Sequence, residues 1–217
     1  MDETKIKGVF ITFEGPEGGG KTTQIQLLAT FLRENGYEVL ATREPGGTGM
    51  GISVRNILLD PSFEKMDQRA ELMLFAADRA QHVSDLIRPA LQAGKVVLCD
   101  RYTDSTIAYQ VGGRGFSPEL ISMINSFSSY DVRPDLTLLL DVPYQIGIKR
   151  ATKIYSDRFE QEKQQFHERI REMYLKLRQE DPDRIHLLDT SKDHIEIVQR
   201  QIRQILLKTE LFGKLNV

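Results

Sequence analysis

The chain has 217 residues, of which 40% are apolar and 28% are charged, and it contains one cysteine. This size and composition predict a single globular domain, residues 1–217, and would leave two full-size domains cramped. The 29 basic and 31 acidic side chains give a formal net charge of −2, which argues against an overall electrostatic surface for DNA or RNA. Cys99 and four dispersed histidines provide neither an internal disulfide nor a cluster of zinc ligands.

The apolar run nearest the N-terminus is only five residues long, residues 9–13. A membrane-spanning helix needs about 20 apolar residues, and a signal peptide also needs a longer apolar stretch. We therefore expect no signal peptide and no membrane partner, and we expect a cytoplasmic protein. From the net charge, we also expect no nucleic-acid polymer as partner.

Short apolar, β-branched runs alternate with longer stretches of helical periodicity, a pattern typical of βαβ units and a parallel sheet. The five predicted strands are residues 9–14, 37–42, 95–99, 135–141 and 184–189. The predicted helices are residues 22–35, 67–91, 105–112, 118–127, 157–180 and 194–208. The sequence therefore predicts an α/β fold with a five-stranded parallel sheet.

Two helix ends carry local signals. Gly36 follows the apolar stripe of the first helix, in the position that a left-handed C-terminal cap requires. Asp157, with Glu160 three residues later, resembles a capping box. This second signal predicts that a charged helix begins at residue 157, with Arg158 in its first turn.

Each predicted strand runs into charged residues. Because the carboxyl ends of parallel strands meet at one edge of the sheet, these side chains should gather where ligands bind. Asp141 and Asp189 have a simpler interpretation, since either can cap or precede the next helix. The doublets at residues 43–44 and 100–101 fit capping less well, and their two arginines suggest an anion at this edge.

Residues 15–22 read Gly-Pro-Glu-Gly-Gly-Gly-Lys-Thr and match the G-x-x-x-x-G-K-[ST] pattern between a strand and a helix. Such a loop presents backbone N–H groups and a helix N-terminus to phosphates. Lys21 would reach the β and γ phosphates, and the Thr22 hydroxyl would ligate Mg²⁺. The predicted ATP-binding residues are Gly15, Pro16, Glu17, Gly18, Gly19, Gly20, Lys21, Thr22 and Thr23.

A phosphate-binding loop serves kinases, motors and GTPase switches alike. No N-K-x-D segment follows a late strand, and a motor's acidic pair is not evident. Arginines that are well separated in the sequence could instead clamp a second phosphorylated substrate. This favours a kinase, while a kinase of another nucleotide or small alcohol, or a nucleotide-dependent switch, remains an alternative.

Several further motifs resemble those of bacterial thymidylate kinases. They are F-E-G-P-E-G-G-G-K-T-T at 13–23, R-E-P-G-G-T at 43–48, L-F-A-A-D-R at 74–79, D-R-Y-T-D-S-T-I-A-Y-Q at 100–110 and P-D-L-T-L-L-L-D-V at 134–142. The resemblance extends from residue 9 to about residue 206. It implies a three-layer P-loop kinase fold with a short helical lid at about residues 149–160. It also implies phosphorylation of dTMP to dTDP with MgATP, which feeds dTTP synthesis, and a homodimer.

The resemblance assigns roles at the nucleoside. Phe75 would stack on the thymine ring, Arg79 would bond a base carbonyl, and Tyr109 would stand where a ribose 2′-hydroxyl collides. Considered alone, Arg79 could instead pack its stem and extend its head into solvent. The residues assigned to dTMP are Glu17, Glu44, Arg55, Phe75, Arg79, Arg101, Ser105, Thr106, Tyr109 and Gln110.

At the phosphates, the resemblance has Arg55 and Arg101 hold the monophosphate and Glu17 accept a hydrogen bond from the 3′-hydroxyl. Asp100 would order Mg²⁺ through water and orient Arg101, and with Thr22 it forms the predicted metal site. A salt bridge alone is the other interpretation of Asp100.

The lid departs somewhat from its bacterial relatives. Eukaryotic relatives have an arginine at the position of Gly18, so the transition-state charge must be met from elsewhere, and Arg158, Arg150 and Lys153 are the candidates. Arg158 is preferred for fixing the closed lid or meeting the charge, with Arg150 as a possible direct contact. A solvated basic face is the alternative for each. The predicted catalytic residues are Lys21, Arg101, Asp100, Arg158 and Arg150.

Overall fold

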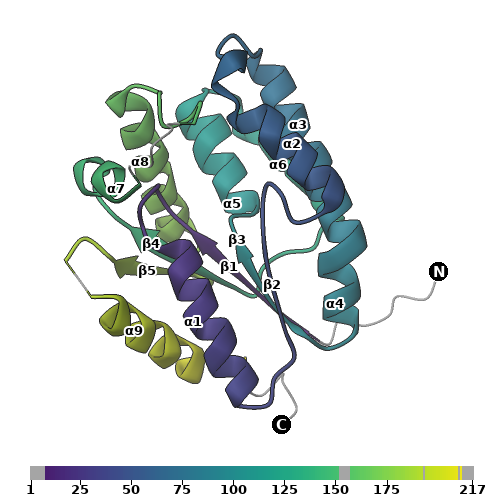
Figure 1. Ribbon diagram of the computed structural model, residues 1–217, viewed down its shortest axis with the longest axis vertical. Coiled ribbons are helices and arrows are strands. Elements are labelled where there is room, and N and C mark those ends of the chain that lie inside the picture. Colours follow the sequence, from purple (N-terminus) through teal and green to yellow (C-terminus); the bar gives the residue numbers. More distant parts are fainter. Residues whose placement is uncertain (1–7, 152–156, 193, 210, 212–217) are drawn as a thin grey trace.

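The computed structural model describes residues 8–151, 157–192, 194–209 and 211 (Figure 1). Its centre is a parallel sheet with the strand order β2-β3-β1-β4-β5. The predicted five-stranded parallel sheet is confirmed. The strands are β1 (Val9–Glu14), β2 (Val39–Arg43), β3 (Val96–Asp100), β4 (Leu136–Asp141) and β5 (Ile185–Asp189).

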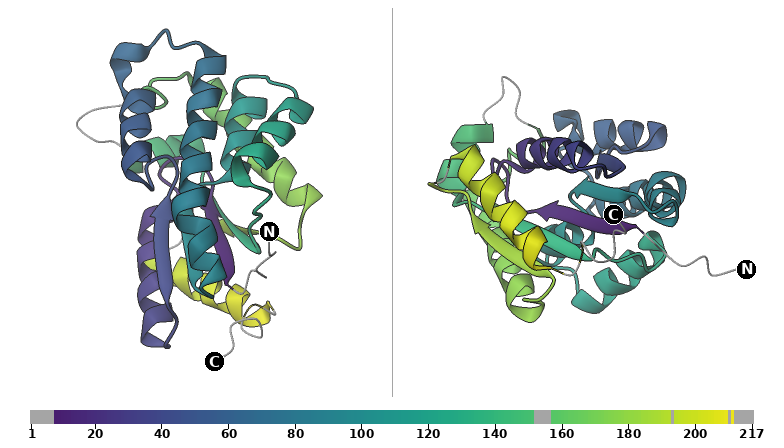
Figure 2. Two further views of the ribbon diagram at one scale, coloured as in Figure 1. Left: turned by 90° about the vertical axis from the view of Figure 1, so that its right-hand side faces the viewer. Right: turned by 90° about the horizontal axis from the view of Figure 1, so that it is seen from below.

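Helices cover both faces of the sheet, because alternate residues of β1 point in opposite directions (Figures 1 and 2). Ile11 belongs to an apolar cluster with α1 (Lys21–Glu34) and α9 (Ile195–Lys208). Phe10 belongs to a second cluster, on the other face. The helices of this second layer are α3 (Gln68–His82), α4 (Arg88–Gln92), α5 (Thr103–Thr106), α6 (Pro118–Ser129) and α8 (Gln164–Glu180). The result is the predicted three-layer arrangement.

Two of the predicted helices are interrupted, and two helices were not predicted. The predicted helix 67–91 consists of α3, a π-helical segment at Val83–Ile87 and α4. Likewise, α5 continues into a π-helical segment at Ile107–Gly113. Three elements were not predicted from the sequence: α2 (Gly49–Leu59), a short 3₁₀ turn (Pro61–Phe63) and α7 (Tyr144–Ala151). The Thr48 hydroxyl caps α2 by accepting from the Gly51 N–H at 2.9 Å. None of the described helices combines the length and apolar character that a membrane crossing requires.

The predicted start of the charged helix was wrong. The α8 helix begins at Gln164, and Asp157 caps a separate turn by accepting from the N–H groups of Phe159 and Glu160, both at 2.9 Å. Arg158 therefore does not lie in the first turn of a helix. The capping pattern was real, but it closes a turn, because a local hydrogen-bonding motif does not by itself extend a helix.

Candidate active site

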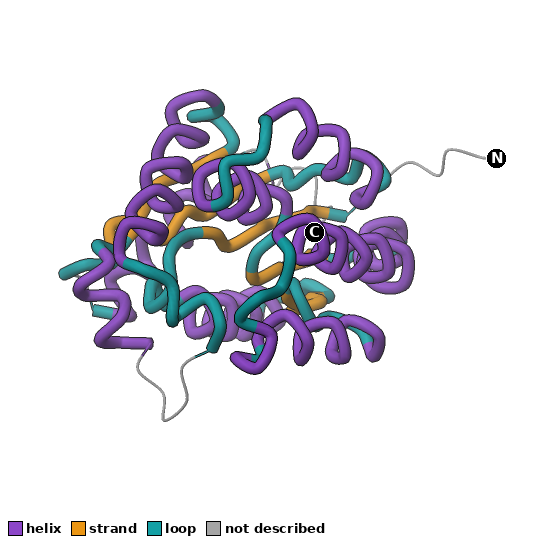
Figure 3. Tube along the Cα trace, turned by 90° about the horizontal axis from the view of Figure 1, so that it is seen from above, coloured by secondary structure: helices purple, strands orange, loops and turns teal. Residues whose placement is uncertain are grey.

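A cavity of about 520 Å³ lies at the carboxyl edge of the sheet. Figure 3 views the molecule from above Figure 1, with the sheet in the centre and helices on both sides. The wall of the cavity is formed by residues of the phosphate-binding loop, the ends of β2 and β3, helices α2, α3, α5 and α7, and the segment 107–113. The site residues predicted from the sequence that line this cavity are Glu17, Gly18, Gly20, Lys21, Thr22, Thr23, Glu44, Arg55, Phe75, Arg79, Asp100, Arg101, Ser105, Thr106, Tyr109, Gln110 and Arg150.

Two glycines allow the loop to approach its neighbours. Gly15 has φ +126°, and a Cβ there would lie 2.2 Å from the Leu140 carbonyl oxygen. Gly18 has φ +73°, and a Cβ there would lie 2.1 Å from the carbonyl oxygen of Gly147 in α7. Both positions therefore require glycine. The loop has no space for an arginine at position 18 in this packing.

Lys21 and the start of α1 form an anion site. The Lys21 ammonium donates to the carbonyl oxygens of Gly15 at 3.0 Å and Pro16 at 2.7 Å. Burial, assisted by the positive charge of Arg101, lowers the pKa of Lys21. The N-cap of α1 is Gly20, so no side chain satisfies the first N–H groups of this helix. These groups and the ammonium suit phosphate oxygens.

Thr22 and Asp100 bring two oxygen atoms together beside this loop. The Thr22 hydroxyl donates to Asp100 Oδ2 at 2.7 Å. Hydroxyl and carboxylate oxygens are ligands that Mg²⁺ accepts, with waters and substrate phosphates completing its shell. Among the described residues, no group of three or more acidic, histidine or cysteine side chains could hold a metal alone. The pair therefore fits an ion that arrives with a nucleotide.

Arg101 follows β3 in a left-handed conformation, with φ 71°. Its guanidinium pairs with Glu17 and donates to the hydroxyls of Ser105 at 3.3 Å and Tyr174 at 3.2 Å. Burial alone would raise the pKa of Glu17, but the charges of Arg101 and Lys21 lower it to about 2. Glu17 is therefore a carboxylate that can accept a hydrogen bond.

A second arginine, Arg55 of α2, lies near the first. It donates to the Pro45 carbonyl oxygen at 3.0 Å. Burial, and then the positive charges of Arg43 and Arg101, lower its pKa. The guanidinium groups of Arg43, Arg55 and Arg101 are therefore close enough to repel one another, which is typical of an anion-binding site. The anion expected from the strand-end doublets therefore has a place to bind.

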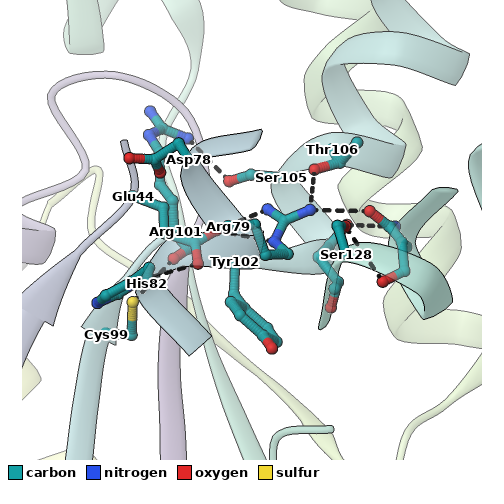
Figure 4. Close-up of polar contacts among 12 residues, drawn as sticks. Glu44, Asp78, Arg79, His82, Cys99, Arg101, Tyr102, Ser105, Thr106 and Ser128 are labelled. Carbon is teal, nitrogen blue, oxygen red and sulfur yellow. Dashed lines mark hydrogen bonds and ion pairs between the residues drawn. The ribbon is translucent and has the colours of Figure 1, made fainter. Parts of the chain in front are cut away.

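Arg79 of α3 is buried, only 3% exposed, and points into a polar network rather than into solvent (Figure 4). Its Nε and one terminal nitrogen contact Glu44 Oε2, each at 2.8 Å. The other terminal nitrogen donates to Thr106 Oγ1 and Asn125 Oδ1, both at 2.8 Å. Because four acceptor contacts fix its plane, Arg79 presents a rigid edge to the cavity.

Glu44 is held by this network as well. Its Oε1 faces the Nδ1 of His82, at 3.0 Å, while its Oε2 receives Arg79. Glu44 thus lines the cavity mainly as the support of Arg79. His82 and Asn125 were not predicted from the sequence. The position of His82, three residues after Arg79 on the same face of α3, was the one signal for it.

Aromatic side chains line the same cavity as Arg79. The Phe75 ring lies 5.9 Å from that of Phe159, and the Tyr109 ring lies 5.8 Å from the same Phe159 ring in an edge-to-face arrangement. Next to them, the Gln110 amide donates to Glu71 Oε1 at 2.9 Å. Planar aromatic surfaces beside a fixed hydrogen-bonding edge suit a nucleobase.

A family model described as thymidylate kinase matches residues 13–202. The chain belongs to the thymidylate kinase family. It is 52% identical over 202 residues to a thymidylate kinase of Pseudomonas putida, covering 93% of this chain and 96% of that protein. A Protochlamydia amoebophila thymidylate kinase is 44% identical over 211 residues, covering 93% and 94%. The crystal structure of thymidylate kinase from Ehrlichia chaffeensis superposes with a TM-score of 0.74 at 36% identity, covering 92% of this chain and 98% of that one.

In this member of the thymidylate kinase family, the two described arginines of the predicted lid segment differ in position. Arg150 lines the cavity, and its guanidinium donates to the carbonyl oxygens of Thr190 at 2.8 Å and Ser191 at 3.1 Å. Arg158 is 7% exposed and is not among the lining residues; its Nε donates to the Leu58 carbonyl oxygen at 2.9 Å. Lys153 lies outside the described residues.

The last two strand-end aspartates have structural partners, although the hydrogen bonds described for them cap neither following helix. Asp141 receives two bonds from Arg171 of α8, both at 2.7 Å. Asp189 accepts from the Ser191 N–H at 2.8 Å, which closes a turn after β5. Neither aspartate lines the cavity of about 520 Å³ at the carboxyl edge of the sheet.

Proposed function

We propose that this protein transfers the γ-phosphoryl group of ATP to dTMP, producing dTDP and ADP. The observation that carries the proposal is that one cavity joins a phosphate-binding loop, three neighbouring arginines and a rigid base-sized edge. A switch or a motor would need the first of these features but not the other two. Membership of the thymidylate kinase family supports the same reaction.

The substrates would approach from opposite ends of the cavity. ATP phosphates would lie on the amides of residues 15–22, against Lys21. The dTMP phosphate would lie between Arg55 and Arg101, its 3′-hydroxyl would donate to Glu17, and its base would lie against Phe75. Both phosphates would then meet at the carboxyl edge of the sheet, in position for an in-line transfer.

The catalysis is positioning and electrostatic stabilisation, with no covalent enzyme intermediate. Lys21 and Arg101 would balance the charge on the transferring group and on the acceptor phosphate. Mg²⁺ held by Thr22, and through water by Asp100, would neutralise phosphate oxygens. Since position 18 cannot hold an arginine, we assign the lid charge to Arg150 and the fixing of the lid's end to Arg158.

We also propose that the protein is a homodimer in the cytoplasm, where ATP and dTMP occur. Apolar side chains are exposed on two packed helices: Met73 of α3 is 50% exposed, and on α6 Met123 is 64% and Phe127 is 86% exposed. An exposed apolar patch of this kind is typical of an interface. Light scattering should give the mass of two chains, and Phe127→Glu should give the mass of one.

ADP release with dTMP, dUMP, UMP and dCMP as acceptors tests the reaction. We expect dTMP to give the highest kcat/KM. Comparable efficiency with dCMP would contradict the roles of Arg79 and Gln110, and comparable efficiency with UMP would contradict the role of Tyr109. ATP binding without phosphorylation of any acceptor would indicate a switch, and a different preferred acceptor would indicate another small-molecule kinase.

A further inference from the structure

The side-chain amide of Gln110 is bound at one end only. Gln110 is 1% exposed, and its Nε2 donates to Glu71 Oε1 at 2.9 Å. Its Oε1 is buried and has no hydrogen-bond partner within the part of the chain that the structure describes. Gln110 lines the cavity, beside Arg79 and Phe75. A buried, unsatisfied carbonyl oxygen at a cavity wall is suited to accept from a ligand N–H group.

Glu71 fixes which end of that amide faces the ligand. A carboxylate only accepts hydrogen bonds, so the Gln110 atom that faces Glu71 must be the NH₂ group. The carbonyl oxygen is then left for the other side. An amide without such a neighbour could turn by 180° and present either a donor or an acceptor at nearly equal cost.

Two arginines keep Glu71 ionised, although it is 1% exposed. Arg114 donates to both carboxylate oxygens, at 3.1 and 2.9 Å, and the Arg158 guanidinium lies 2.6 Å from Oε2. Burial alone would raise the pKa of Glu71, but the hydrogen bonds and charge of Arg114 lower it below its ordinary value. Glu71 therefore does not become a donor at neutral pH.

We propose that Glu71 is a specificity-determining positioning residue, which selects bases with an N–H group at ring position 3 by fixing the Gln110 carbonyl oxygen toward the cavity. This inference rests on the proposed function. Thymine and uracil carry a hydrogen at N3, whereas neutral cytosine has a lone pair there, which would oppose the Gln110 oxygen. A hydrogen-bonding site rejects the wrong partner strongly when its own polar group is left unpaired.

Glu71→Gln tests the proposal, because it keeps the size of the side chain while allowing the Gln110 amide to turn. We expect KM for dTMP to rise about tenfold, with kcat and KM for ATP within about twofold. Inhibition by dCMP should weaken less than dTMP binding does, or should become stronger. The ratio of the dCMP inhibition constant to KM for dTMP should therefore fall about tenfold or more. Glu71→Asp, which still only accepts, should keep more of this ratio than Glu71→Gln.

Glu162→Gln is the matched control. Glu162 is the other carboxylate on Arg114, at 2.5 Å, and it is not a partner of Gln110. The Glu162→Gln variant should therefore leave the ratio of the dCMP inhibition constant to KM for dTMP unchanged. If Glu71→Gln does not fold, Gln110→Leu tests the same amide and should also lower the ratio.

The proposal is overturned if folded Glu71→Gln or Gln110→Leu keeps the parent ratio, or if Glu162→Gln lowers it equally. Failure of the parent protein to phosphorylate dTMP at all would instead overturn the proposed function.

Discussion

The two ends of the cavity are built in different ways. At the phosphate end, one contiguous loop, residues 15–22, presents backbone N–H groups, and its shape depends on glycines. At the base end, two polar groups that line the cavity are side chains held by other buried side chains: Glu44 orients Arg79, and Glu71 orients Gln110. The phosphate end should therefore tolerate the loss of a side chain without losing its shape, whereas the base end should not.

The largest effect we expect is at the phosphate end, from Lys21→Ala. Lys21 bonds only carbonyl oxygens of its own loop among the bonds described, so the loop should keep its shape without it. Removing this charge from the transition state should lower kcat by at least about 1000-fold, or about 4 kcal/mol. Steady-state kinetics would measure the loss, and circular dichroism would check the fold. Turnover within about threefold of the parent would contradict the assignment of the loop.

Arg79→Lys should show the opposite behaviour at the base end. Lysine keeps the charge beside Glu44 but cannot reach Thr106 and Asn125 at the same time. We expect KM for dTMP to rise about 30-fold, or about 2 kcal/mol, while KM for ATP is unchanged. Asn125→Ala, which removes one acceptor only, should raise KM for dTMP by about fivefold. Equal changes in both KM values would show that the two ends are not independent.

This contrast also explains what the sequence could predict. The loop was predictable because its function depends on adjacent residues, and the sheet because buried parallel strands are continuous apolar runs. The residues that support the base end were not. Glu71, His82 and Asn125 appear in the sequence as ordinary polar positions on helices. Their partners come from positions distant in the chain: Gln110 for Glu71, Glu44 for His82 and Arg79 for Asn125. Helix α2 was missed because its glycine-rich start hides the apolar periodicity.

The two arginines of the proposed lid offer a sharper comparison, since Arg150 lines the cavity, whereas Arg158 lies behind the base end and contacts Glu71. In single-turnover kinetics with saturating ATP and dTMP, Arg150→Ala should slow the chemical step by about tenfold, because it would remove the cation that we assign to the transferring group. Arg158→Ala should slow that step less and lower the melting temperature more, because it leaves Glu71 with one cation fewer. The reverse order would give the catalytic role to Arg158. If both variants and Lys153→Ala leave the step unchanged, the lid is only a cover.

The smallest effect that we expect concerns Asp78 of α3 and its contribution to the free energy of unfolding. Asp78 accepts from the Gly46 N–H at 3.1 Å, and burial, together with the charge of Glu44, raises its pKa from 3.8 to about 6. As the pH rises from about 4 to about 6, the unfolded chain loses the Asp78 proton while the folded protein still holds it. The contribution of this group to the free energy of unfolding therefore falls over that range. Between pH 5 and pH 7 it should lower the free energy of unfolding by about 1 kcal/mol.

Asp78→Asn should remove this contribution, because asparagine keeps an acceptor for Gly46 and carries no charge beside Glu44. Glu14, whose pKa burial and the charge of Asp104 raise to about 7, adds a slope of its own, but that slope is common to both proteins and cancels. Urea unfolding at both pH values should therefore show Asp78→Asn gaining on the parent by about 1 kcal/mol from pH 5 to pH 7. A constant difference between the two proteins would mean that Asp78 is already ionised at pH 5, and that Asp78 of α3 and Glu44 carry two buried negative charges side by side.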